Sequence, residues 1–196
     1  MLQSVTVPDV AAKRILWRQQ IPSEATKHLV FLDESGININ MTRYYGRAYS
    51  SERVSDHVPL KKTKSTTVLS SIRVDGKKVF TTFSGGTTGE RFLSYLKDNL
   101  IPTLQPGDIV VMDNMRSHHI KAVSELLFQH HIQLLYLPPY SPDLNPIEMM
   151  WSKMKAILRK WKIRIEDQLG DAVTRALAQV SSLDCQHWFQ HAGYYQ

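Results

Sequence analysis

The 196-residue sequence has one cysteine and no long hydrophobic run. No stretch approaches the roughly 18 apolar residues of a membrane-spanning helix, so no membrane partner is expected. The N-terminus lacks a basic segment followed by an apolar one, which argues against a secretory signal peptide. Cys185 cannot form an internal disulfide, and this fits a reducing cytosol. These absences predict a cytoplasmic globular protein.

Repeats, low-complexity segments and an excess of acidic charge are also absent. Lys and Arg number 24 against 18 Asp and Glu, which gives a formal net charge of +6. This excess favours a polyanionic partner, although many basic proteins bind none. The apolar fraction of 42% is that of an ordinary globular protein, and the length allows one sizeable core. We expect a lead-in over residues 1–27 and one domain over residues 28–196.

Apolar patterning predicts an α/β fold. Short apolar runs rich in β-branched or aromatic residues predict strands, and Asp75-Gly76 predicts a hairpin turn between two of them. The predicted strands cover residues 28–33, 64–73, 78–83, 108–113 and 132–137, and the predicted helices cover 11–20, 90–104, 117–131, 146–162 and 165–180. Because strands and helices alternate in the second half, we expect parallel strands with crossover helices, in a mixed sheet flanked by helices.

Acidic residues follow two of these strands. Asp33 ends the first strand, Asp113 ends the fourth, and Glu148 opens the helix after the fifth. Ligand sites in open α/β sheets lie beyond the carboxyl ends of strands, so the three carboxylates are expected at one edge. A simpler interpretation exists for Glu148. Asn145 suits a helix N-cap, Pro146 suits the first helical position, and Glu148 then completes a capping box.

Three carboxylates at one site repel one another unless cations neutralise them. Oxygen ligands select hard ions such as Mg²⁺ or Mn²⁺. Two such ions about 3.5–4 Å apart clamp the attacking and leaving oxygens of an in-line phosphoryl transfer. We therefore predict that Asp33, Asp113 and Glu148 bind two Mg²⁺ or Mn²⁺ ions and catalyse this reaction without a Cys or Lys nucleophile.

Three stretches also carry a family resemblance. HLVFLDES, GDIVVMDN and LLYLPPYSPDLNPIEMMWSKMK resemble the catalytic domain of DDE-superfamily transposases. The most similar branch is the bacterial insertion-sequence branch of the mariner superfamily, the IS-six-thirty group. The likeness runs from about residue 28 to the AGY near the C-terminus. PPYSPDLNPIE is its most specific part, and the interval from Asp113 to Glu148 is the one expected of that branch.

The resemblance implies a ribonuclease-H-like fold and a cut-and-paste transposase. It assigns catalysis to Asp33, Asp113 and Glu148. It implies double-stranded DNA, both element ends and target, as the substrate, and a homodimer in a bacterial cytoplasm in association with the nucleoid. In relatives the segment after the first strand, residues 37–63 here, can contact a partner subunit.

One departure concerns the N-terminus. Relatives carry a helix-turn-helix region there that recognises the terminal repeats of the element. The residues before Asp33 are too few for two such modules. We therefore expect a truncated copy, or the second half of a protein split over two reading frames, with a separate helix-turn-helix region as a possible partner.

Several polar residues near the carboxylates have two interpretations. Asn114 and Asn145 can orient metal-bound carboxylates, or can serve only turn and cap chemistry. His118 is close enough in sequence to Asp113 to touch the scissile phosphate. Glu34 follows Asp33 on a strand and is expected on the opposite face. The two His-His pairs lack zinc-site spacing, and the loop at residues 84–89 lacks the Lys-Ser/Thr of a phosphate-binding P-loop.

Candidate DNA contacts fall in two places. Basic and aromatic residues interleave over residues 37–63, which suits phosphate contact and base stacking, but also suits a solvated loop or extra hairpin. On the helix of Glu148, a polar stripe through Ser152 continues with basic residues, and its alternative is a solvated surface. The candidates are Arg43, Arg47, Lys61, Lys62, Lys155 and Arg159.

Two other functions remain open. A catalytically silent DNA-binding or dimerisation remnant of a transposase would have the same sequence features. A nuclease of the same fold, such as a ribonuclease H, would also use three carboxylates. The PPYSPDLNPIE stretch argues against the nuclease, and the intact triad argues against the remnant.

Overall fold

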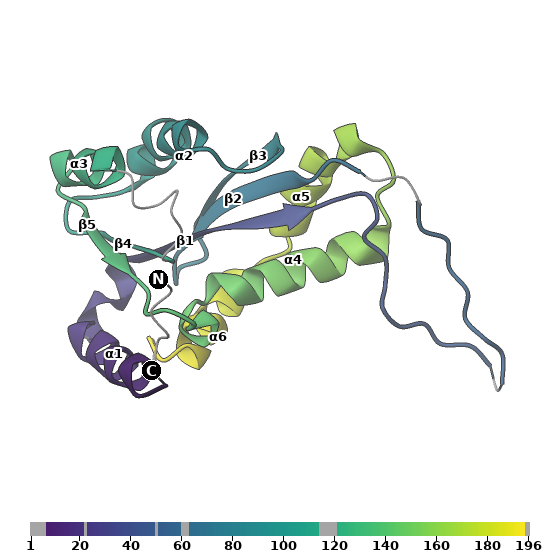
Figure 1. The fold of residues 1–196 in the computed structure, drawn as a ribbon, viewed down its shortest axis with the longest axis horizontal. Helices are drawn as coiled ribbons and strands as arrows, with labels where there is room; N and C mark the ends of the chain where they lie inside the picture. The colour runs from purple at the N-terminus through teal and green to yellow at the C-terminus, as the bar shows by residue number, and fades with distance from the viewer. Residues whose placement is uncertain (1–6, 22, 50, 60–62, 114–120, 195–196) are drawn as a thin grey trace.

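A mixed sheet forms the centre of the fold (Figure 1). The computed structural model describes residues 7–21, 23–49, 51–59, 63–113 and 121–194. Within these residues the sheet has five strands in the order β3-β2-β1-β4-β5. The strands are β1 (Leu29–Ile37), β2 (Thr66–Ile72), β3 (Lys78–Ser84), β4 (Ile109–Met112) and β5 (Gln133–Tyr136). Strands β1, β4 and β5 are parallel, β2 and β3 pair antiparallel, and the predicted mixed sheet is confirmed.

Alternating side chains of β1 face two separate hydrophobic cores. Phe31 packs in one core, and Val30 and Leu32 pack in the other. The first core is covered by α1 (Val7–Gln20), α4 (Ile147–Trp161), α5 (Leu169–Leu177) and α6 (Ser182–His191). The second is covered by α3 (Lys121–Gln129) and by α2 (Gly89–Tyr95), which continues as a π-helix (Leu96–Leu100) and a 3-10 turn (Ile101–Thr103). Further 3-10 turns span Ser23–His28, Pro142–Leu144 and Glu166–Gln168. No described helix has both the length and the apolar character needed to cross a membrane.

The hairpin predicted at Asp75-Gly76 joins β2 and β3. Gly76 adopts a φ of +90°, in the left-handed region that favours glycine. It also lies against α6, because a Cβ on Gly76 would be 2.8 Å from the Cα of Ser182. Both the turn and the packing therefore require glycine at this position.

The first strand is longer than predicted, so Asp33 lies in the middle of β1 and not at its end. Leu32 is the last β1 residue paired with β4, whereas antiparallel pairing with β2 continues to Ile37. The polar residues after Leu32 resemble a strand end in sequence, but β2 supplies them with a pairing partner. Asp33 still follows the parallel part of the sheet, which is where the prediction needed it.

The C-terminal segment forms two helices, where one helix over residues 165–180 was predicted, and the second lies in the aromatic stretch after it. The extra helix α6 begins at a capping box between Ser181 and Asp184. Its Phe189 packs edge-on against Phe31 of β1, with ring centroids 5.3 Å apart. The aromatic tail is therefore part of the core.

The described residues between β1 and β2 (38–49, 51–59 and 63–65) form an arm that extends away from the sheet (Figure 1). Its described residues form no helix or strand. Two limbs of the arm touch at Gly46, where a Cβ would lie 2.4 Å from a methyl of Val54. Tyr45 and Tyr49 are 90% and 91% exposed. The arm therefore presents aromatic rings to the solvent.

The C-terminal end of α4 anchors this arm. Arg159 Nη2 donates to the Tyr44 hydroxyl at 2.9 Å, and the guanidinium lies 4.4 Å from the Tyr44 ring centroid. Lys162 Nζ is 2.7 Å from a carboxylate oxygen of Asp56. Arg164 donates to two backbone carbonyls where the arm begins. Three cations of the α4 end therefore fix the root of the arm.

Helix α1 braces the loop between β5 and α4. Arg14 Nη1 donates to Asp143 Oδ1 at 2.8 Å. The indole N–H of Trp17 donates to the Tyr194 hydroxyl at 2.8 Å, and that hydroxyl donates to the Leu144 carbonyl at 2.7 Å. The predicted division between lead-in and domain stays a prediction, but Trp17 is buried in the core that contains α4.

Replacing Tyr194 by Phe should lower the free energy of unfolding by about 1–3 kcal/mol, because two buried polar groups lose their partner. The measurement is the urea midpoint at unchanged slope. Tyr45→Phe is the matched control, since the Tyr45 side chain is 90% exposed, and should stay within about 0.5 kcal/mol. Equal midpoints for Tyr194→Phe and the wild type would contradict the bracing role.

Candidate active site

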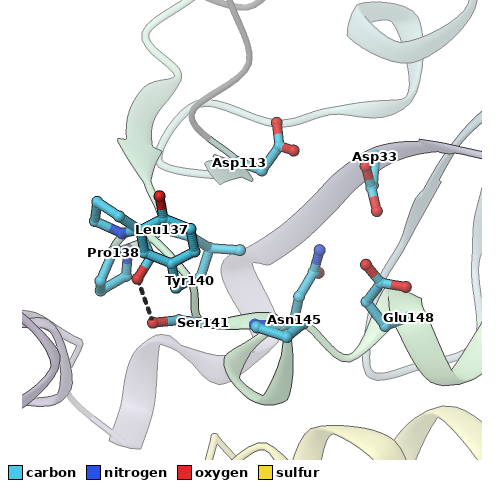
Figure 2. Close-up of a pocket in the computed structure, with 10 residues that line it drawn as sticks. Asp33, Asp113, Leu137, Pro138, Tyr140, Ser141, Asn145 and Glu148 are labelled. Carbon is cyan, nitrogen blue, oxygen red and sulfur yellow. Dashed lines mark hydrogen bonds between the residues drawn. The ribbon is translucent and has the colours of Figure 1, made fainter. Parts of the chain in front are cut away.

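A cavity of about 440 Å³ lies beyond the ends of β4 and β5. It is lined by Asp33, Asp113, Leu137, Pro138, Pro139, Tyr140, Ser141, Pro142, Asn145 and Glu148. Figure 2 shows the three carboxyl groups around one space, with the Asn145 side chain directed toward it. The structure therefore brings together the three acidic residues that the sequence singled out.

Three different elements position these carboxylates. Asp33 follows Leu32, the last residue of β1 paired with β4. Asp113 directly follows β4, and its alternation with Val111 puts it on the α4 face of the sheet. Glu148 lies in the first turn of α4 and is exposed. Because α4 packs on the same face, its first turn meets the sheet edge where the two aspartates lie.

Asp33 is the most buried of the three, with 6% of its surface exposed. Burial raises its pKa from 3.8 to about 7. A hydrogen bond from the Glu34 backbone N–H at 2.7 Å opposes this rise, while the charges of Asp113 and Glu148 add to it. The site thus disfavours a third negative charge until a cation is present.

Trp151 contacts this carboxylate and was not among the predicted site residues. Its indole N–H donates to Asp33 Oδ2 at 3.2 Å, and the side chain is 3% exposed. A buried indole usually finds an acceptor for its N–H, and this was the available signal in the sequence. Trp151 therefore fixes the orientation of Asp33 from the helix that carries Glu148.

The predicted capping box at Asn145 is wrong. Pro146 is the N-cap of α4, and no side chain caps this helix. Asn145 instead ends the preceding 3-10 turn, with its N–H donating to the Pro142 carbonyl at 3.0 Å. Its Oδ1 is buried and has no partner among the described residues. Asn145 lines the cavity, and Figure 2 shows its side-chain amide directed toward the carboxyl groups.

The donor set fits hard divalent cations such as Mg²⁺ or Mn²⁺. It consists of the carboxylate oxygens of Asp33, Asp113 and Glu148. Within the described residues, no three His, Cys, Asp or Glu side chains lie close enough together to hold an ion. A bound cation would draw the carboxylates inward.

Glu34 lies on the opposite face of the sheet, as predicted. The Thr87 hydroxyl, in the loop before α2, donates a hydrogen bond to its carboxylate. Glu34 therefore has a partner on the α2 side of the sheet and does not line the cavity.

Of the other predicted contacts, the four that the structure describes, Arg43, Arg47, Lys155 and Arg159, do not line this cavity. Asn114, His118, Lys61 and Lys62 lie outside the described residues, so these predictions are not tested. Arg43 and Arg47 are exposed on the arm. Lys155 and Arg159 line a second cavity of about 320 Å³ with Tyr44 at the root of the arm.

The raised pKa of Asp33 gives a pH test without metal. The folded state keeps a proton on Asp33 between about pH 4 and pH 7 that the unfolded chain releases. The contribution of Asp33 to stability therefore falls as pH rises over this window, by at most about 1.4 kcal/mol per pH unit, and is constant above it.

Asp33→Asn removes this titration. In EDTA its melting temperature should therefore rise relative to that of the wild type as the pH increases from 4 to 7. Carboxylates with lowered pKa values, such as Asp184, are present in both proteins, so their pH-dependent contributions to stability cancel in the comparison. Parallel melting curves across this range would contradict the raised pKa.

Comparison with known proteins places this geometry in a family. A family model described as DDE superfamily endonuclease matches residues 28–169. A pre-cleavage Mos1 transpososome is similar at 16% identity and a TM-score of 0.74, over 92% of this chain and 57% of that chain. The Mos1 mariner paired end complex with Mn is similar at 18% identity and a TM-score of 0.71, over 92% of this chain and 56% of that chain. The catalytic domain of Mos1 mariner transposase is similar at 16% identity and a TM-score of 0.69, over 97% of this chain and 91% of that chain.

This chain thus spans little more than half the length of the transposases in the two complexes. At these identities the likeness shows the fold, and the predicted ribonuclease-H-like arrangement is confirmed. No curated protein matches the sequence. The family match covers most of the chain and includes Asp33, Asp113 and Glu148. The chain therefore belongs to the DDE superfamily of endonucleases.

Proposed function

We propose that this chain is the catalytic domain of a cut-and-paste DNA transposase, which cleaves DNA and transfers the cut strand. The observation that carries the proposal is the single cavity lined by Asp33, Asp113 and Glu148. Burial and the neighbouring charges of Asp113 and Glu148 raise the pKa of Asp33 to about 7 in the ligand-free site. A carboxylate in this environment favours a site built for cations.

The acidic residues of the cavity have the central role in this proposal. Asp33, Asp113 and Glu148 would hold Mg²⁺ or Mn²⁺, and the Asn145 amide would help to orient these carboxylates. When bound, two such ions supply charge neutralisation for the attacking and leaving oxygens. The chain itself supplies orientation, because Trp151 and a backbone N–H hold the Asp33 carboxylate in place before substrate arrives.

The proposed reaction is an in-line substitution at phosphorus. A water oxygen, or the 3′-hydroxyl of a cut strand, forms a bond to phosphorus while the bond to the leaving 3′-oxygen breaks. The proton of the nucleophile passes to solvent. The lining of the cavity contains no Cys or Lys, which agrees with a reaction that needs no covalent enzyme intermediate.

The partners are also proposed by likeness. Similar structures are described as a paired-end complex with a transposon end and as a strand transfer complex. We propose that this chain likewise binds element ends and target DNA as a homodimer, beside the nucleoid, with a helix-turn-helix region to recognise the ends. The arm and the root of the arm supply the basic candidates Arg43, Arg47, Lys155 and Arg159.

Asp33→Asn, Asp113→Asn and Glu148→Gln should each abolish cleavage of a labelled duplex that carries the inverted repeat bordering the gene. Without metal their melting temperatures should hold or rise, since one repelling charge is gone. In the wild type, Mg²⁺ at 100 times its Kd should add about 2.7 kcal/mol of stability. Asp113→Asn should lose most of this gain.

Glu34→Gln is the matched control, because Glu34 is acidic and adjacent to Asp33 but contacts Thr87 on the other face. It should cleave at the wild-type rate. Clear Mg²⁺-dependent cleavage by any triad variant would overturn the assignment. A wild type that binds repeat DNA but never cuts it, even with an upstream helix-turn-helix protein added, would favour the silent remnant.

The basic stripe of α4 is a second test. Replacing Lys155 and Arg159 together by Gln should weaken binding to any DNA and lower the salt slope by up to about two units. The Arg159 change also acts indirectly, because Arg159 holds Tyr44 at the root of the arm. Tyr44→Phe keeps the ring stacked on Arg159 but removes the hydroxyl, and should retain most binding.

The matched control is Lys97→Gln with Lys121→Gln, two exposed lysines on the other layer of helices. This double variant should bind DNA with a nearly unchanged salt slope. If both double variants behave alike, the stripe is a solvated surface and the DNA path lies elsewhere.

A further inference from the structure

Tyr140 combines two costly features at the rim of the carboxylate cavity. Its side chain is 81% exposed, and its backbone has a φ of +55°. A residue other than glycine in this left-handed region strains the backbone. An exposed aromatic ring in strained backbone gives the fold no evident gain.

The turn around Tyr140 is held from both sides, which explains how the strain persists. Pro138 is buried before it, and Ser141 is 5% exposed after it. The Ser141 hydroxyl donates to the Pro139 carbonyl at 3.2 Å and accepts from Arg14 Nη1 at 3.1 Å. The backbone is therefore fixed while the ring remains outside the core.

The position of the ring relates it to the active site. Tyr140 lines the same cavity as Asp33, Asp113 and Glu148. Figure 2 shows its ring beside Leu137 and Pro138, at the end of the cavity away from Glu148. Its hydroxyl has no hydrogen-bond partner within the described residues, so the ring faces are its main means of contact.

We propose that Tyr140 is a stacking surface for one unstacked nucleobase of the DNA strand bound at the carboxylates. This inference rests on the proposed function, because it takes the scissile phosphate to lie at Asp33, Asp113 and Glu148. A base inside a duplex has both faces covered by its neighbours, so an aromatic ring can stack only on a base that has left the helix or ends it. Tyr140 therefore selects DNA that is opened next to the scissile phosphate.

The test pairs ring variants with abasic DNA. Tyr140→Asn removes the ring, and Asn tolerates a positive φ, so stability should hold or rise. Affinity for the repeat duplex in Ca²⁺ and single-turnover cleavage in Mg²⁺ should fall by roughly 5- to 150-fold, the range for one stacked base. Tyr140→Phe should keep wild-type values, because it keeps the ring.

A series of duplexes, each with one abasic nucleotide near the cleavage site, then locates the base. At one position the wild type and Tyr140→Asn should bind equally, because the ring has nothing to stack on. At the other positions Tyr140→Asn should still bind more weakly than the wild type, by the same factor as on the intact duplex. Phe128→Ala is the matched control, since Phe128 is 80% exposed on α3 over the other face, and should match the wild type throughout.

The outcomes separate the two proposals. If the wild type cleaves and Tyr140→Asn binds and cleaves equally well, the stacking role is overturned and the proposed function stands. If the ratio between the two proteins is the same at every abasic position, Tyr140 acts through the turn and not on a base. If the wild type never cleaves, the proposed function fails, and the stacking role fails with it.

Discussion

Repulsion among three carboxylates is the constraint on which the rest of this structure depends. Asp33, Asp113 and Glu148 meet at one cavity, and burial raises the pKa of Asp33 to about 7. Flexible segments would relieve such repulsion by moving apart. Here Asp33 lies in β1, which pairs with strands on both sides, and Glu148 begins a fifteen-residue helix packed on the same core. The rigidity of these elements keeps the charges near one another.

The loop between β5 and α4 depends on residues from both ends of the chain. Arg14 and Trp17 come from α1, and Tyr194 comes from the end of the described chain. Their hydrogen bonds hold Asp143, Leu144 and the backbone that leads into Glu148. Residues far apart in sequence therefore set the position of a catalytic carboxylate, which is why truncation at either end would reach the active site.

Local patterns in the sequence predicted the sheet and the three carboxylates because those features depend on neighbouring residues. The strand runs, the glycine of the hairpin and the alternation that separates Glu34 from Asp33 are all local. The failures depend on distant partners. Asp33 looked like a strand end because β2, which pairs with it, follows a long arm. Asn145 looked like a cap because nothing local shows that the 3-10 turn before it already uses its backbone. The contact of Trp151 with Asp33 spans 118 residues and has no local pattern.

Two buried aspartates of the fold, Asp33 and Asp108, have different surroundings. Asp108 is as buried as Asp33, and burial alone would raise its pKa, yet bonds from Arg73 and the Gln105 N–H hold that pKa below its usual value. Within the described residues no cation bonds Asp33, and its carboxylate accepts from the Trp151 indole and from the Glu34 N–H. In the proposed function, a divalent cation would neutralise Asp33 as Arg73 neutralises Asp108. The contrast between the two buried aspartates therefore supports the proposed cation site at Asp33.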